Sequence, residues 1–218
     1  MDEFSLIQKI IIWAIPVLFA VTLHEVAHGW AALHFGDRTA QMLGRLTLNP
    51  IKHIDPIGTI IVPSLLAMTT GFIFGWAKPV PVNARNMKNA KTSMAWVALA
   101  GPTANLLMAL FWSVIVLIGL SASEALAYMG LVGIFINTML MLLNLLPLPP
   151  LDGGRILMSV LPGPLAWQMS RLEPYGFIIL LALLYFGIIG MVLWPLVSGF
   201  VSLLPIPFSA AQLLNLLF

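Results

Sequence analysis

The sequence is short of charge and has no cysteine at all. Only 8% of its 218 residues are charged, against about 25% in soluble domains, and 60% are apolar. A chain this apolar cannot cover itself with a polar surface, so the composition excludes a soluble domain and predicts a lipid bilayer as solvent. Because cysteine is absent, any metal ligands must be His, Asp or Glu. Basic residues do not gather with aromatic ones, which argues against a nucleic-acid partner.

Long apolar runs predict an all-α polytopic membrane protein with about five to six transmembrane helices. The runs cover residues 4–35, 57–76, 93–120, 127–146 and 175–200, and the tail 203–218 is either a sixth short span or an interfacial helix. We expect one integral membrane domain over residues 1–218, with the motifs in residues 20–155 and further helices in residues 175–218. Residues 44–48 alternate in polarity, which predicts a short strand.

The first apolar run contains a His-Glu-x-x-His motif at residues 24–28. On a helix, His24 and His28 lie one turn apart on the same face, so both rings can reach one zinc ion. Glu25 is offset around the helix, where it can act on a metal-bound water without being a ligand. Hydrolytic zinc sites use three protein ligands and one water, so a third ligand must come from elsewhere. The alternative, two histidines placed by chance on a core helix, does not account for the glutamate or the apolar setting.

Asp152 is the best candidate for the third ligand. It follows the proline-rich residues 147–150 at the end of an apolar run, and non-helical backbone at membrane depth is tolerated only where it lines a cavity or is buried. The alternative is an Asp-Gly turn just outside the membrane. The histidine pair and Asp152 share a metal only if their two helices are parallel. That condition requires residues 57–76 to re-enter the membrane without crossing it, as a re-entrant β/loop segment.

The distribution of basic residues is an independent test of this path. With a re-entrant segment, one side of the membrane holds nine basic residues: Arg38, Arg45, Lys52, Lys78, Arg85, Lys88, Lys91, Arg155 and Arg171. The other side holds Lys9 alone, whereas a full crossing divides the basic residues seven to three. The positive-inside rule therefore predicts a multi-pass protein of the cell membrane, with its N-terminus outside and its site open towards the cytoplasm.

These motifs together resemble the site-2 proteases, which are intramembrane zinc metalloproteases. The resemblance rests on motifs in residues 24–28, 44–50, 75–83, 101–105, 144–147 and 151–153, and it is to the compact prokaryotic type without a PDZ or CBS domain. It implies an endopeptidase that hydrolyses peptide bonds within or near transmembrane segments of membrane proteins, in regulated intramembrane proteolysis. It also implies one Zn²⁺ per chain, bound by His24, His28 and Asp152, with Glu25 as the catalytic acid/base.

Further site residues are predicted beside the metal. The family has polar asparagines near the metal, which Asn144 and Asn105 match. Either asparagine would donate to the developing oxyanion or hold the substrate strand; the alternative is hydrogen bonding between helices. Val80 and Val82 lie in an extended, proline-bearing segment, which would pair with an unwound strand of the substrate. The implied partners are transmembrane substrates and the lipid bilayer.

Two other classes of protein stay open. A membrane metal-binding or transport protein would use the same His/Asp cluster, although transporters usually have paired halves and the sequence has no internal repeat. Another membrane zincin would need Glu173 as its third ligand, but this residue stands beside Pro174 in a predicted loop. His53 is interpreted as a loop residue that pairs locally with Asp55, with a role in the site as the alternative.

Overall fold

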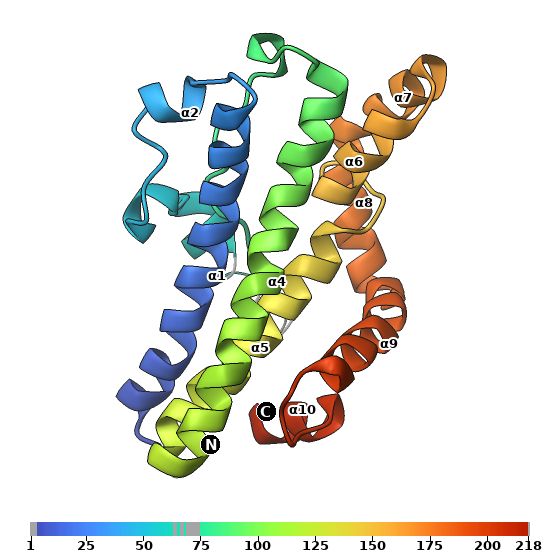
Figure 1. Ribbon diagram of the computed structural model, residues 1–218. Helices are drawn as coiled ribbons and strands as arrows, with labels where there is room; N and C mark the ends of the chain where they lie inside the picture. Colours follow the sequence, from blue (N-terminus) through green and yellow to red (C-terminus); the bar gives the residue numbers. More distant parts are fainter. Residues whose placement is uncertain (1–3, 63–64, 66–67, 69–74, 218) are drawn as a thin grey trace.

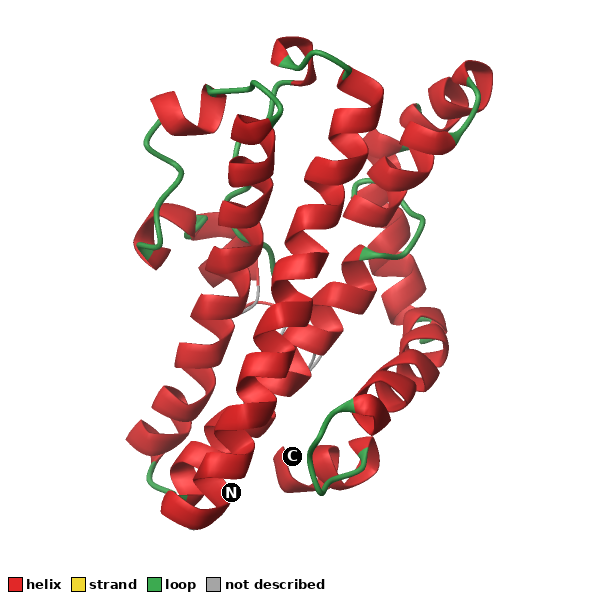
Figure 2. Cartoon of the chain, viewed as in Figure 1, coloured by secondary structure: helices red, strands yellow, loops and turns green. Residues whose placement is uncertain are grey.

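The computed structural model describes residues 4–62, 65, 68 and 75–217, and over these residues it is helical with no strand (Figures 1 and 2). Three long helices form the bundle: α1 (Leu6–His34), α4 (Ala90–Ala122) and α5 (Glu124–Asn144). Helix α4 packs against both α1 and α5. In Figure 1, α1 and α5 run in the same direction and α4 runs in the opposite one. The parallel arrangement that the sequence predicts for the two ligand-bearing regions is therefore present.

Local signals explain where α1 begins and ends. Ser5 and Gln8 form a capping box, in which each side chain accepts a hydrogen bond from the other residue's backbone N–H. The helix ends at Phe35, and Gly36 follows with φ of 105°, a conformation that glycine adopts without strain. The first apolar run was predicted to end at residue 35, and this end is confirmed.

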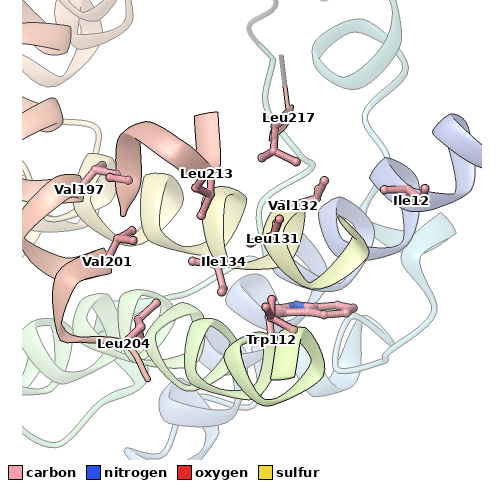
Figure 3. Close-up of a cluster of buried hydrophobic side chains, with 12 residues drawn as sticks. Ile12, Trp112, Leu131, Val132, Ile134, Val197, Val201, Leu204, Leu213 and Leu217 are labelled. Atoms are coloured by element: carbon pink, nitrogen blue, oxygen red, sulfur yellow. The ribbon is translucent and has the colours of Figure 1, made fainter. Parts of the chain in front are cut away.

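Apolar packing closes the half of the bundle in which α1 begins (Figure 3). Here Trp112 of α4 lies against Gly133 of α5, where an added Cβ would overlap the indole ring. Val116 lies in the same way against Gly130. Small residues let helix backbones approach closely, and in lipid this close packing is the main attraction between helices. The cluster continues onto the C-terminal helices through Val197, Val201, Leu204, Leu213 and Leu217.

The described residues contain fewer membrane-spanning helices than the five to six estimated for the whole chain. The described residues contain three helices long and apolar enough to cross a membrane, which are α1, α4 and α5. A fourth span results if α8 (Glu173–Tyr185) and α9 (Ile188–Leu203) count together, although they bend by 78°. Gly187 stands at the bend with φ of 72°. The tail forms a short helix, α10 (Ala210–Leu217), which packs on α5 and α9.

The two ends of the second apolar run meet. The N–H of Trp76 donates to the carbonyl of Gly58 at 3.0 Å, and the hydroxyl of Thr59 donates to the carbonyl of Trp76 at 2.9 Å. A helix of this length that crossed the membrane would separate its ends by roughly 27 Å. The predicted re-entrant path agrees with this contact, although most of residues 63–74 lie outside the described residues.

The predicted strand at residues 44–48 is wrong. This stretch is a loop between the short helices α2 (Thr39–Met42) and η1 (Pro50–His53). A strand needs a neighbouring strand to satisfy its backbone, and none lies beside it in the described part of the chain. Gly44 turns the chain with φ of 63°, and Arg45 then bonds to backbone carbonyls of residues 78 and 79.

Candidate metal centre

Two helices bring together three side chains that are far apart in the sequence. His24 and His28 lie on α1, and Asp152 is the first residue of α6 (Asp152–Val160). The Nε2 atoms of the two histidines are 3.0 Å apart, and Asp152 Oδ2 lies 3.2 Å from each of them. The three residues are buried, with exposed fractions of 7%, 9% and 7% respectively. The ligands that the sequence predicts therefore converge on one point.

A tight fold of the chain carries Asp152 to this point. Helix α5 ends at Asn144, and the prolines that follow cannot continue it. Gly153 then lies directly against the carbonyls of Leu145 and Leu146, where an added Cβ would overlap both oxygens. Gly154 lies equally close to the backbone of Leu148 and Pro149. Only residues without a side chain fit here, so the two glycines after Asp152 allow α6 to start beside the end of α5.

Hydrogen bonds to the other ring nitrogens set the tautomers of the histidines. His24 Nδ1 lies 2.6 Å from Asn105 Oδ1, and His28 Nδ1 lies 2.7 Å from the carbonyl of Val97. The Asn105 amide is oriented by its nitrogen, which donates to the carbonyl of Ala20 and to Asn137 Oδ1. Both partners of the histidines are thus acceptors, so each Nδ1 carries the proton. Each Nε2 presents a lone pair to the centre, as in most metal-binding histidines.

The chemistry of the three atoms fits zinc. Two imidazole lone pairs and a carboxylate oxygen face one another in a buried place, and Asp152 Oδ2 has no hydrogen-bond donor among the described residues. Such a cluster of acceptors is unfavourable without a cation. Their separations of 3.0–3.2 Å are close to the roughly 3.4 Å between ligands of a tetrahedral zinc with bonds of about 2.0–2.1 Å. Three protein ligands also leave one position open, as catalytic zinc sites require.

Gly101 gives the histidine rings their space. An added Cβ on this residue of α4 would overlap His28 Nε2 and would lie 2.6 Å from the Cε1 atoms of both rings. Helix α4 therefore passes directly over the metal-facing side of α1. The sequence contains this glycine within a family-like motif, but no pattern in the chain indicated that it faces the metal ligands.

Asn105 lies behind His24 and not in the cavity of the site. It is fully buried, and its amide is occupied by His24, Ala20 and Asn137. This position is unsuited to the oxyanion role that the resemblance implied. Asn137 continues the chain of hydrogen bonds and donates to the carbonyl of Gly133 at 2.8 Å. Sequence reasoning missed Asn137, although an asparagine in the middle of an apolar run is itself a signal.

A cavity of about 140 Å³ opens at the cluster. Besides the three ligand candidates, its lining includes Glu25, Val80, Val82, Asn144 and Arg155. The carboxylate of Glu25 accepts a hydrogen bond from the N–H of Val80 at 2.7 Å. The amide of Asn144 donates to the carbonyl of Leu140 at 2.9 Å, which leaves its second hydrogen for another acceptor.

Asp37 anchors the loops beside the site. It is fully buried, and its carboxylate accepts hydrogen bonds from Thr39, from the N–H of Asn83 and from the amide of Asn86. Burial alone would raise the pKa of this carboxyl, but the four donated hydrogen bonds outweigh it and hold the pKa below the ordinary value of 3.8. The negative charge thus ties the end of α1 to residues 83–86.

His53 does not pair with Asp55, so that interpretation is wrong. The His53 ring is buried and its Nε2 lies 2.9 Å from the carbonyl of Thr47. Asp55 instead accepts hydrogen bonds from the N–H groups of Ile57 and Gly58, as the cap of the short π-helix η2 (Pro56–Ile61). Local capping accounts for Asp55 and a nearby carbonyl for His53 Nε2, while His53 Nδ1 is buried without a partner among the described residues. His53 is not among the residues that line the cavity.

Comparison with known proteins points in one direction. Residues 118–184 match the model of Peptidase family M50. Two relatives, whose names both begin "Putative zinc metalloprotease", cover more of the chain. YwhC of Bacillus subtilis is 42% identical over 193 residues, which are 85% of each chain. Rip2 of Mycolicibacterium smegmatis is 31% identical over 177 residues, which are 77% of this chain and 64% of Rip2. No solved structure matches the chain.

Proposed function

This chain belongs to peptidase family M50, the site-2 protease family, and is a zinc metalloprotease of the membrane; from this premise we propose that it cleaves other membrane proteins within or near their transmembrane segments. The observation that carries the proposal is the depth of the site. His24 and His28 lie well inside α1, one of the helices apolar and long enough to cross a membrane. A substrate must therefore reach them from within or beside the bilayer.

We propose His24, His28 and Asp152 as the zinc ligands and Glu25 as the acid/base. When bound, zinc supplies a Lewis acid for the scissile carbonyl and makes water acidic enough to lose a proton near neutral pH. Glu25 accepts that proton and delivers it to the leaving amine. Its position one residue after His24 on the same helix and its place in the cavity lining support this role.

Asn105 is better assigned to the support of His24 than to the oxyanion. Its carbonyl oxygen accepts from His24 Nδ1 at 2.6 Å, so it fixes the ring and keeps the lone pair on Nε2. The oxyanion role is left to Asn144, which lines the cavity and has one amide hydrogen without an acceptor among the described residues. Such a donor matters most where water is scarce, because few other groups can compensate the developing charge.

The substrate strand is proposed to pair with the segment of residues 78–83. Four of these six residues carry an N–H, and three of the four donate to His53, Glu25 and Asp37. The N–H of Val82 has no partner among the described residues. In an extended chain it points to the same side as the carbonyl of Val80. We therefore assign hydrogen bonding with the substrate strand to the N–H of Val82 and the carbonyl of Val80. The N–H of Val80 is not available for it, because it donates to Glu25.

The same proposal includes the placement of the protein in the cell membrane. Nine of the ten basic residues fall in segments predicted on one side, which supports an N-terminus outside and a site open to the cytoplasm. The meeting of Gly58 and Trp76 supports the re-entrant path on which that count depends.

The decisive experiment compares the native protein with Glu25→Gln in detergent, using a panel of tagged single-span peptides, with bound zinc quantified in both. We expect cleavage to fall at least a hundredfold while zinc content is unchanged, since general acid/base catalysis contributes about 10²–10⁴-fold. Glu124→Gln is the matched control, because Glu124 is exposed at the start of α5, far from the site. Equal cleavage by Glu25→Gln would overturn the assigned role.

Zinc binding without cleavage of any peptide by the native protein would favour the other class, a metal-binding or transport protein. Zinc uptake into proteoliposomes would then decide between the two classes.

A further inference from the structure

One peptide group lies between an arginine and the proposed catalytic carboxylate. The N–H of Val80 donates to Glu25 Oε2 at 2.7 Å. The carbonyl of the same peptide belongs to Pro79, and it accepts from Arg45 Nη2 at 3.4 Å. The same nitrogen donates to the carbonyl of Lys78 at 2.8 Å. In a trans peptide the N–H and C=O point in opposite directions, so Arg45 and Glu25 hold this peptide from its two sides.

The sequence leaves one backbone donor within residues 79–81. Pro79 and Pro81 flank Val80 and have no N–H, so Val80 supplies the one donor in three consecutive residues. Its side chain is 6% exposed and is held against Gly29, where an added Cβ would lie 3.0 Å from Val80 Cγ1. The peptide is therefore fixed by its side chain as well as by its hydrogen bonds.

Charge favours the same arrangement. Arg45 makes no ion pair with a carboxylate in the described part of the chain. Its positive charge lies at the oxygen end of the peptide dipole, and the negative charge of Glu25 lies at the hydrogen end. Each charge strengthens the hydrogen bond on the other side, because hydrogen bonds to charged groups are stronger and chains of them polarise one another.

We propose that Arg45 is a positioning residue for Glu25, acting through the Pro79–Val80 peptide; this inference rests on the proposed function. Arg45 fixes residues 78 and 79, these fix the N–H of Val80, and the N–H fixes the carboxylate beside the metal ligands. A glutamate side chain has three rotatable bonds, and a displacement of about 1 Å in a catalytic group can cost a hundredfold in rate.

The kinetic test uses Arg45→Ala, Arg45→Lys and Val80→Pro, with Arg38→Ala as the control. Arg38 is exposed in the same loop region and makes no side-chain bond at the start of α2. We expect Arg45→Ala to lower kcat at least tenfold, with KM and zinc content unchanged. Arg45→Lys should recover part of the loss, since lysine keeps the charge but not the planar fork. Arg38→Ala should behave as the native protein.

A double variant of Arg45 and Val80 tests whether Arg45 acts on catalysis through the N–H of Val80. Val80→Pro removes the N–H, so Arg45 has nothing left to position, and the double variant should lose no more kcat than Val80→Pro alone. Losses that multiply, a loss of zinc in Arg45→Ala, or a rise in kcat in Val80→Pro would each overturn the proposal. The last result would mean that the Glu25–Val80 bond restrains the enzyme.

A measurement that needs no substrate separates this inference from the proposed function. Within residues 78–83 the amides of Lys78, Val80, Val82 and Asn83 are the ones that exchange with solvent. We expect the Val80 amide to exchange at least tenfold faster in both Glu25→Ala and Arg45→Ala, while Arg38→Ala leaves it unchanged. If Arg45→Ala does not change its exchange, the positioning role is wrong even in an active enzyme. If the native protein cleaves nothing, this exchange still decides the inference.

Discussion

The two halves of the helical bundle bury different kinds of side chain. The half in which α1 begins is closed by apolar packing, with Trp112, Leu131 and Ile134 at its centre. The other half buries His24, His28, Asn105 and Asn137 of the same helices, together with Asp152 of α6. In the apolar half, shape alone holds the helices together, so many similar side chains would serve. In the polar half the histidines and Asn105 have specific hydrogen-bond partners, and a change in one residue alters the position of the next.

The polar half sets the geometry of the site. Apolar packing in lipid brings helices together but tolerates small shifts. A buried hydrogen bond tolerates little, because a buried polar group without its partner is costly. We therefore expect substitutions in the polar half to change metal binding and catalysis, and substitutions in the apolar half to change stability. The following predictions test that division, from the largest effect to the smallest.

Asp152→Ala should give the largest effect. It removes one of three proposed ligands and leaves two buried imidazole lone pairs facing each other. We expect zinc content to fall below a tenth of the native value after dialysis, and cleavage to be lost with it. Retention of zinc at the native stoichiometry would show that Asp152 is not a ligand.

Gly101→Ala should disturb the same site without touching a ligand. The added Cβ overlaps His28 and crowds His24, so the rings must move or α4 must shift. We expect zinc affinity to fall about 10–100-fold, as for changes that disturb the support of metal ligands. Gly190→Ala is the matched control, because a Cβ there meets nothing within 4 Å. Competition with a chelator measures both, and equal affinities would contradict the close packing described here.

Trp112→Ala should show the opposite behaviour. It opens a cavity in the apolar half, and the free energy of unfolding in mixed micelles should fall by about 3 kcal/mol. Zinc stoichiometry and KM of the remaining folded protein should not change. A large loss of zinc from this variant would mean that the two halves are not separable.

Asp37→Asn should give the smallest effect and one that depends on pH. Because the folded pKa of Asp37 lies below the ordinary value of 3.8, its carboxylate stabilises the fold above that value, and this stabilisation is lost as the pH falls through the folded pKa. At neutral pH the variant should be about 1–3 kcal/mol less stable. The difference from the native protein should shrink in acid, and a difference that stays constant from pH 7 to pH 3 would contradict the assignment.

Much of the helical fold could be predicted from the sequence, because long apolar runs in lipid can form few kinds of structure. The predicted first run, residues 4–35, encloses α1, and the all-helical class is confirmed for the described residues. The parallel direction of the two helices followed from requiring that His24, His28 and Asp152 meet. Their role as ligands stays a prediction, since geometry alone does not bind a metal.

The hydrogen-bond and packing partners of individual side chains could not be predicted, because they depend on contacts between segments that are distant in the sequence. Alternating polarity in residues 44–48 predicts a strand, but Arg45 found carbonyls 33 and 34 residues away. Asn105 was predicted as a donor to the oxyanion or a holder of the substrate strand, with hydrogen bonding between helices as the alternative, and the structure shows it bonded to His24 of α1. Gly101 faces the histidines of α1 and Asn137 bonds to Asn105 of α4, and no pattern within their own helices can reveal these contacts.

The two prolines that flank Val80 limit how many strands can pair with this segment. Along residues 79–82 the N–H groups that exist belong to alternate residues, so they all lie on one edge of an extended segment. The opposite edge has carbonyls but no donors, and it cannot form a ladder with a second strand. If substrate pairs with this segment as proposed, one chain at a time docks here, and on one edge only. Further strands then have no donors to pair with on the opposite edge, which protects a lipid-embedded enzyme from becoming a template for aggregation.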